Sequence, residues 1–339
     1  MEPMSTSEPE PMIRFEAASK TYPDGTQAVH PLTLDIRQGE VAVLVGASGC
    51  GKTTTMRMVN RLQEPTSGRV VVGGRDVMTV DLKELRLAMG YVIQQIGLFP
   101  HLNVRKNVAT VCKLSGWSKS RTNDRVDEML ELVGLPAAEF GDRYPHQLSG
   151  GQRQRVGVAR GLAADPPVLL MDEPFGAVDP IARGHLQEQF LALQAKVRKT
   201  VIIVTHDIDE AVRLGDRIAV MRTGGYLEQF ATPAEVLARP ASEFVAEFTG
   251  TDRTLKRLAV TPVESGELEP AGPDAEDLLN VPANASLRDA LAVLLDSKAG
   301  RVSVGTPGRL DGVLTMQGVY RALRTATDEL PVESDAVTT

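Results

Sequence analysis

Residues 46–53 have the sequence GASGCGKT and lie between an apolar run, 41–45, and a segment with helical periodicity. Glycines permit positive φ angles and let the backbone approach an anion closely. Amide N–H groups at a helix start stabilise phosphate oxygens, Lys52 adds a positive charge, and the Thr53 hydroxyl can bind Mg²⁺. The spacing therefore predicts a loop that binds the phosphates of a nucleotide such as ATP. The residues predicted to line this loop are Gly46, Ala47, Ser48, Gly49, Cys50, Gly51, Lys52, Thr53 and Thr54.

Two carboxylates, Asp172 and Glu173, follow another apolar run, 168–171. Open α/β sheets bind ligands at the carboxyl ends of their strands, so we expect these side chains beside the phosphate loop. Asp172 suits Mg²⁺ coordination through water, and Glu173 suits polarising an attacking water. Pro174 disfavours the right-handed α conformation at Glu173. The pair predicts hydrolysis of the bound nucleotide.

A second stretch rich in serine and glycine, residues 148–152 with the sequence LSGGQ, immediately precedes a predicted helix. The start of a helix is a second potential anion site, and a simple helix cap is the alternative interpretation. The residues predicted to contact phosphate here are Ser149, Gly150, Gly151 and Gln152.

The elements that must position these residues follow from apolar periodicity. Short Val/Ile/Leu runs that alternate with helical segments predict an α/β fold, with a parallel sheet covered on both faces. Thr232 followed by Pro233 predicts a further helix start. The predicted strands are 41–45, 70–72, 168–171, 201–204 and 218–221, and the predicted helices are 52–62, 125–133, 152–164 and 182–197.

The rest of the chain is predicted to contain a second, small unit. Residues 251–280 carry three prolines and an acidic excess, which predicts a linker. In residues 281–325 the pattern predicts an α+β unit, and about 45 residues are too few to bury a stable core alone. We therefore expect this unit to pack on a copy of itself or on a neighbour. A disordered leader, 1–11, and a disordered tail, 326–339, complete the predicted organisation. The elements predicted in the small unit are a helix capped by Ser286 and ending at 296, strands 301–304 and 313–314, and a helix 316–323.

Composition excludes several classes of protein. The 339 residues include 42% hydrophobic and only 4% aromatic residues, and the net charge is −7, which argues against a nonspecific nucleic-acid binder. The two cysteines make no disulfide framework and favour a reducing cytoplasm. The N-terminus lacks the apolar segment of a signal peptide, and no run reaches the roughly 18 apolar residues of a membrane span. A membrane role would therefore come through a partner.

Taken together, these motifs resemble the ATP-binding cassette subunits of ABC transporters, over roughly residues 12–250. The resemblance covers the phosphate loop, the LSGGQ signature and the two carboxylates, and it places Asp179 in the D-loop. It makes His206 the switch histidine, Gln94 the glutamine that senses Mg²⁺ and links to the membrane partner, and Tyr22 the aromatic residue that stacks on adenine.

This resemblance implies a P-loop NTPase fold with a RecA-like core, an antiparallel β subdomain and a helical signature subdomain. It implies a head-to-tail dimer in which each ATP lies between the loop of one copy and Ser149 and Gly151 of the other. The dimer would drive membrane permease subunits, contacted near residues 94–107, from the cytoplasmic face of the cell membrane. A substrate-binding protein would act indirectly, and nucleic acid is not an expected partner. The residues implied in catalysis are Lys52, Glu173 and His206, and those implied in holding Mg²⁺ are Thr53, Gln94 and Asp172.

Two further segments narrow the family. Residues 91–101, with the sequence YVIQQIGLFPH, are similar to quaternary-amine importers, the systems for glycine betaine, choline, carnitine or proline. Residues 281–325 are similar to a CBS repeat, above all at 312–315, and such units report ionic strength or bind adenosine nucleotides. Only one repeat is recognisable where the module pairs two, and Gly318 stands where the family has an acidic ribose contact. A small packing unit without a sensing role is the alternative.

The leading prediction is therefore the ATP-hydrolysing subunit of an osmoprotectant importer. A second transporter hypothesis is an importer of other small molecules, such as amino acids. A soluble cassette ATPase acting on nucleic acid or ribosomes would favour two cassettes in one chain or a strongly basic arm. A non-enzymatic regulator is the last alternative, and the complete set of Lys52, Asp172, Glu173 and His206 argues against it.

Overall fold

The computed structural model describes residues 11–93, 97–176, 178, 180–263, 268–306 and 309–328. The chain divides into two units, Met1–Phe230 and Ala231–Thr339, which we describe separately. Among the described residues, no helix has the length and apolar character needed to cross a bilayer. The predicted leader falls outside the described residues except for residue 11, and the predicted tail is described only as far as 328, where helix α13 ends.

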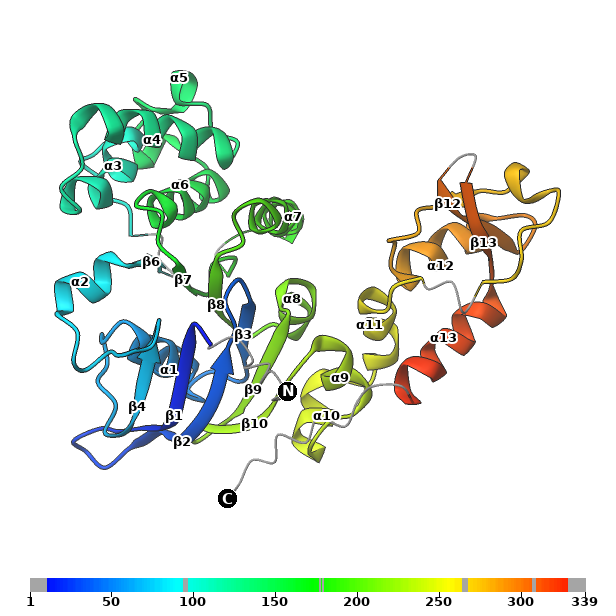
Figure 1. The fold of residues 1–339 in the computed structure, drawn as a ribbon, viewed down its shortest axis with the longest axis horizontal. Helices are drawn as coiled ribbons and strands as arrows, with labels where there is room; N and C mark the ends of the chain where they lie inside the picture. Colours follow the sequence, from blue (N-terminus) through cyan, green and yellow to red (C-terminus); the bar gives the residue numbers. More distant parts are fainter. Residues whose placement is uncertain are drawn as a thin grey trace, which may run out of the picture. The chain divides into compact units, whose positions relative to one another are not determined.

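The centre of the first unit is a six-stranded sheet with the order β10-β9-β3-β8-β7-β6 (Figure 1). Every residue of β3, β7 and β8 is buried, as expected for strands covered on both faces. Strand β3 runs parallel to both β8 and β9, and β7 runs parallel to β8 and β6. The predicted parallel sheet is thus confirmed. Its strands are β3 (Val41–Val45), β6 (Met89–Val92), β7 (Val168–Asp172), β8 (Thr200–Thr205), β9 (Arg217–Arg222) and β10 (Tyr226–Ala231).

A second sheet in this unit has the order β2-β1-β4-β5, and its pairings are antiparallel. Residues 70–72 belong here, so their predicted place in the parallel sheet is wrong. The reason is the dipeptide Gly73-Gly74, in which both φ angles are positive. It turns β4 back into β5 as a tight hairpin, which only antiparallel strands can use. The strands are β1 (Ile13–Thr21), β2 (Gln27–Ile36), β4 (Ser67–Val72) and β5 (Arg75–Asp76).

Helix α1 (Lys52–Val59) packs against strands of both sheets through Met56, Met58 and Val59. Four helices, α3, α4, α5 and α6, gather in a separate subdomain (Figure 1). Helix α6 leads from this subdomain back to the parallel sheet, because it packs against both α3 and β6. The remaining bounds are α2 (Leu82–Leu87), α3 (Val104–Leu114), α4 (Lys119–Leu132), α5 (Ala137–Phe140), η1 (Pro145–Gln147), α6 (Gly150–Leu162), α7 (Pro180–Val197) and α8 (Ile208–Leu214).

The second unit has its own core around a three-stranded sheet with the order β11-β12-β13. Ser286 caps α12 as predicted, and Thr232 caps α9 with Pro233 at the first helical position. The predicted strands and the last helix of the small unit are confirmed with longer bounds. The elements are α9 (Pro233–Ala238), α10 (Glu243–Thr249), α11 (Arg253–Val260), η3 (Ala275–Asp277), β11 (Asn280–Val281), α12 (Leu287–Asp296), β12 (Arg301–Thr306), β13 (Arg309–Thr315) and α13 (Met316–Asp328).

The predicted linker, 251–280, is wrong for much of its described length. Helix α11 occupies its first part and buries Leu258 in the core of the second unit. Further on, the backbone of Glu269 forms two hydrogen bonds of 2.8 Å with Val313, so this stretch extends the edge of the small sheet. Prolines and acidic residues suggested a linker, but a small unit needs this extra apolar cover to bury its sheet.

Candidate functional site

The phosphate loop connects β3 to α1 and has a backbone that only glycine adopts easily. The φ angles of Gly46, Gly49 and Gly51 are +152°, +77° and +91°. A Cβ atom on Gly46 would lie 2.2 Å from the Met221 carbonyl oxygen, and one on Gly51 would lie 2.3 Å from that of Ala28. Both contacts are with backbone, which cannot move aside. The positive φ angles expected of these glycines are therefore present, and the neighbouring backbone adds a second reason for glycine at positions 46 and 51.

Lys52 lies inside this loop and is only 5% exposed. Its Nζ atom donates to the carbonyl oxygens of Gly46 and Ala47, at 2.7 and 2.8 Å. The same ammonium lies 3.7 Å from the buried Cys50 sulfur. Ala47, Ser48 and Gly49 form the exposed crest of the loop. The loop thus holds a desolvated positive charge beneath an exposed backbone, which is the chemistry that a phosphate chain requires.

The residues after Lys52 connect the loop to two other predicted site residues. Thr53 donates from Oγ1 to Oδ1 of the buried Asp172, at 3.0 Å. The hydroxyl groups of Thr54 and Tyr22 lie 3.4 Å apart, so the Tyr22 side chain reaches the phosphate loop. The structure therefore brings together the loop, a predicted Mg²⁺ ligand and the predicted adenine-stacking residue.

Glu173 stands directly after β7 with a positive φ of +43°. Its backbone N–H donates to the Val204 carbonyl oxygen at 2.9 Å, which ties the residue to β8. A non-glycine residue held in this region stores strain, and such residues concentrate at functional sites. Pro174 was expected to keep Glu173 out of the right-handed α region, and the backbone meets that constraint with a positive φ. His206 follows β8 and places Nδ1 3.4 Å from Glu173 Oε1.

Behind His206 lies a buried acid that the sequence analysis missed. Glu210 on α8 is 5% exposed, and its Oε2 accepts a 3.1 Å hydrogen bond from the Thr205 hydroxyl. Burial raises the pKa of Glu210 to about 7, the Thr205 hydrogen bond opposes the rise, and the negative charges of Asp207 and Glu173 add to it. The only sequence signal for Glu210 was its position, one helical turn after the predicted switch histidine.

Glu210 should make stability depend on pH. Because its folded pKa of about 7 lies above the ordinary 4.5, the stabilising proton is fully bound below pH 4.5 and is lost as the pH rises through 7. Relative to wild type, Glu210→Gln should therefore gain up to about 3 kcal/mol of unfolding free energy between pH 4.5 and 8.5. Urea unfolding at both pH values measures this difference. Glu188→Gln, at a carboxylate 63% exposed, is the control and should show no such gain. An equal gain in the control would contradict the assignment.

The LSGGQ segment begins helix α6, with Ser149 as the N-cap. Ser149 Oγ accepts from the Gln152 backbone N–H at 3.2 Å, and the Gln152 side chain accepts from the Ser149 N–H at 2.9 Å. This reciprocal capping box holds the helix start rigid. Gln152 is therefore occupied in supporting the turn, whereas the exposed Ser149 hydroxyl keeps a proton that it can donate.

Two predicted site residues, Gln94 and Asp179, lie outside the described residues. One turn after Asp179, Arg183 places Nη1 3.6 Å from Asp207, and so connects α7 to the turn that carries His206. The sequence analysis also missed Arg57, which lies on α1 and contacts Asp172. Its signal was the spacing of four residues after Thr53, which puts both side chains on one helix face.

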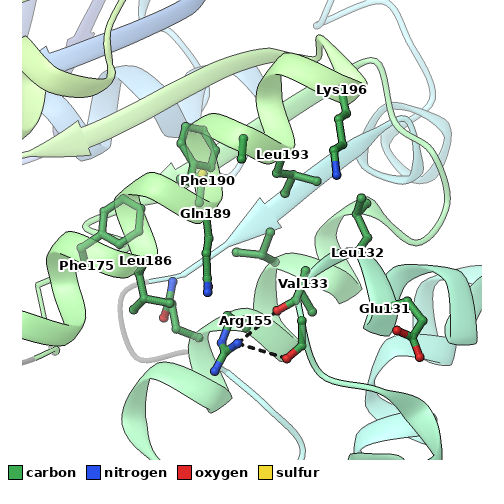
Figure 2. A pocket seen from close by; sticks show the side chains of 15 residues that line it. Glu131, Leu132, Val133, Arg155, Phe175, Leu186, Gln189, Phe190, Leu193 and Lys196 are labelled. Carbon is green, nitrogen blue, oxygen red and sulfur yellow. Dashed lines mark hydrogen bonds between the residues drawn. The ribbon is translucent and has the colours of Figure 1, made fainter. Parts of the chain in front are cut away.

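A cavity of about 220 Å³ lies between α6 and α7 and contains none of the predicted site residues (Figure 2). Its walls are mainly apolar side chains from α6, α7, β7 and the end of α4. Arg155 donates to the carbonyl oxygens of Val133 and Gly134 at its edge. Met171 and Phe175, which also line it, flank the predicted Mg²⁺ ligand Asp172 and the predicted catalytic residue Glu173 in the sequence.

Comparisons with known proteins identify the family of the chain. Residues 29–176 match the family model described as "ABC transporter". The chain is 45% identical to the carnitine transport ATP-binding protein OpuCA of Listeria monocytogenes over 95% of its own length and 79% of the relative's. It is 47% identical to the osmoprotectant import ATP-binding protein OsmV of Salmonella typhimurium, over 86% and 76%. A solved ATP-binding cassette, described as a dimer in a post-hydrolysis state with ADP and Pi, superposes with a TM-score of 0.59 and 32% identity, over 66% of this chain and 99% of that one.

Proposed function

Because this chain belongs to the ATP-binding subunits of ABC transporters, we propose that it hydrolyses ATP to drive the import of a quaternary-amine osmoprotectant such as glycine betaine, carnitine, choline or proline. The observation that carries the hydrolytic part is the meeting of three elements at one sheet edge. The loop after β3 presents Lys52, the end of β7 presents Asp172 and Glu173, and the end of β8 presents His206.

The residues present fit ATP and Mg²⁺. The loop is shaped by glycines whose Cβ positions are blocked by backbone, and it holds a buried ammonium for phosphate. Thr53 Oγ1 and Asp172 Oδ1 are hard oxygen donors 3.0 Å apart. Among the described residues, no group of three His, Cys, Asp or Glu side chains could hold a metal. This suits Mg²⁺, which takes one or two carboxylates and completes its shell with water and substrate phosphates. Gln94 is proposed as a further ligand.

Different residues of the chain have different roles in the proposed hydrolysis. Lys52 binds the β- and γ-phosphates and stabilises their charge, while bound Mg²⁺ would supply further charge neutralisation. Glu173 orients the attacking water by accepting a hydrogen bond from it. His206, whose Nδ1 lies 3.4 Å from Glu173 Oε1, helps to hold that carboxylate in place. The capped turn 205–207 keeps the histidine in position.

The LSGGQ segment is proposed to act on the nucleotide of a second copy. Within one chain it starts a helix in a different subdomain from the phosphate loop (Figure 1). An exposed Ser149 and a rigid helix start suit an anion that arrives from outside. The solved cassette with ADP and Pi is described as a dimer, which supports the pairing of two copies here. Gly150, Gly151 and Asp179 complete the proposed interface.

Permease subunits are proposed to dock near residues 94–107, of which the structure describes 97–107, at the cytoplasmic face of the membrane. Asn107 is fully buried and fixes the loop before it by donating to the carbonyl oxygens of Phe99 and Leu102 and accepting from the Phe99 N–H. This loop leaves Phe99 41% exposed. A rigid loop that presents an aromatic side chain is a suitable anchor for a partner. A substrate-binding protein would act through the permease.

The small C-terminal unit is proposed as a regulatory module that binds an adenosine nucleotide or responds to salt. A packing role alone is the second candidate. The Thr315 hydroxyl accepts a 3.2 Å hydrogen bond from the Gly318 N–H, so the position of the missing acidic contact is used for a local turn. Gly318 has no carboxylate to offer a ribose, which favours a salt response or packing over nucleotide binding.

Transport of labelled glycine betaine tests the proposed function directly. In cells that depend on this chain and are placed in high salt, Lys52→Ala should abolish uptake, because the loop loses its buried ammonium. Lys83→Ala, at an exposed lysine on α2, should leave uptake unchanged. Competition by unlabelled carnitine, choline and proline ranks the substrates. Uptake that survives Lys52→Ala, or that only common amino acids compete with, would replace this proposal with one of the alternatives.

A further inference from the structure

Arg57 lies on the same face of α1 as Thr53, one turn further along the helix. Both residues contact the Asp172 carboxylate, each at a different oxygen. Thr53 Oγ1 donates to Oδ1 at 3.0 Å, and Arg57 Nη2 lies 3.4 Å from Oδ2. The two oxygens of Asp172 are thus distinguished, since one faces the proposed metal ligand and the other faces a cation.

Burial makes this contact important for Asp172. Its side chain is 6% exposed, whereas that of Arg57 is 41% exposed. A carboxylate so far from water needs a charged or hydrogen-bonding partner for both oxygens. Arg57 is the cationic partner found within 4 Å of it in the described part of the chain.

The guanidinium is itself held by a third element. Arg57 Nε donates to the hydroxyl oxygen of Tyr91 at 3.4 Å. Tyr91 lies on β6, directly beside Leu170 of β7, so it is fixed by the sheet. The planar fork of arginine contacts Tyr91 through Nε and Asp172 through Nη2 in one fixed geometry, which the point charge of an ammonium does not reproduce.

From this geometry, we propose that Arg57, oriented by Tyr91, is a positioning residue that holds Asp172 with Oδ1 toward the Mg²⁺ that accompanies ATP. The inference rests on the proposed function, because it concerns the metal of that site. Partners that orient a metal ligand without touching the metal set its affinity, and their loss typically costs about 10–100-fold. Arg57 lies outside the phosphate loop, so its loss should not change how the loop binds the nucleotide alone.

Mn²⁺ titrated into the full-length protein with a non-hydrolysable ATP analogue, and followed by electron paramagnetic resonance, reads metal affinity without turnover. Arg57→Gln should raise the half-saturating Mn²⁺ concentration about tenfold or more. Tyr91→Phe should raise it roughly threefold and add little in the double variant, since both act on one carboxylate. Arg57→Lys should resemble Arg57→Gln, because orientation and not charge is lost. Arg75→Gln, in an exposed ion pair with Glu84, is the matched control.

The outcomes separate this inference from the proposed function. Binding of a fluorescent ATP analogue in the presence of EDTA should be equal in wild type and Arg57→Gln, which also shows that the variant is folded. A half-saturating Mn²⁺ concentration that is unchanged or lowered in Arg57→Gln would overturn the positioning role, because a guanidinium acting only by charge would compete with the metal. Wild-type affinity in Arg57→Lys would also overturn it. Failure of wild type to bind nucleotide or Mn²⁺ would instead overturn the proposed function on which the inference rests.

Discussion

Glu173→Gln should lower ATP turnover by about a thousandfold and leave ATP binding almost unchanged. Glutamine has nearly the shape of glutamate, so the strained turn after β7 and its bond to Val204 should remain. The amide cannot act as a general base, and it loses the charge that faces His206 at 3.4 Å. ATP then stays intact between two copies, and the closed dimer should accumulate.

Single-turnover phosphate release measures the loss of chemistry, and size-exclusion chromatography with ATP measures the dimer. Glu188→Gln, on the exposed face of α7, is the control and should turn over ATP at the wild-type rate. Turnover by Glu173→Gln within a few-fold of wild type would remove Glu173 from the chemical step. Loss of ATP binding together with turnover would indicate a structural role instead.

Mixing two inactive variants should restore activity if the sites are shared between copies. Lys52→Ala removes the phosphate loop's charge, and Gly151→Asp places a carboxylate beside the phosphate at the signature helix. The second variant should still fold, because a Cβ on Gly151 has only an ordinary 3.5 Å contact with Leu186 and acids are favourable in the first turn of a helix. A mixed head-to-tail dimer contains one site with both halves intact.

Each variant alone should hydrolyse ATP at about the background rate. An equal mixture should recover up to about a quarter of wild-type activity, because half of randomly paired dimers are mixed and each has one intact site of two. Steady-state phosphate release is the measurement, and capture of untagged Lys52→Ala chains by an affinity-tagged Gly151→Asp chain controls for exchange of subunits. If both halves of a site came from one chain, the mixture would stay as inactive as its components.

The parts of the site that could be predicted are those that depend on backbone conformation and hydrogen bonds between residues close together in the sequence. The phosphate loop needs glycines at fixed offsets, because the backbone of the turn has positive φ angles at Gly46, Gly49 and Gly51. The same holds for Ser149, whose cap depends on a residue three positions away. Such constraints are visible in any sequence that satisfies them.

What escaped prediction depends on pairing across the fold. Arg57 and Glu210 are ordinary charged residues until β7 and β8 bring Asp172 and the His206 turn beside them. The linker prediction failed for a similar reason. Its composition suggested an exposed chain, and only the uncovered sheet of the small unit makes Leu258 a core residue. The periodicity of one segment does not show which contacts that segment makes with another segment of the fold.

The order of strands in the central sheet also has a consequence for synthesis on the ribosome. Strand β3, which leads into the phosphate loop, has β8 and β9 as its neighbours, and Val43 lies beside Ile203 and Ile218. The nascent chain therefore carries residues 41–45 without their first partner strand until residue 205 has been made, and without their second until residue 222. The carbonyl of Met221 that closes over Gly46 arrives at the same late stage. Long-range pairing of this kind is slow and leaves apolar strands exposed meanwhile. The nucleotide site, whose phosphate loop precedes these strands in the chain, is thus among the last parts of the cassette to be completed.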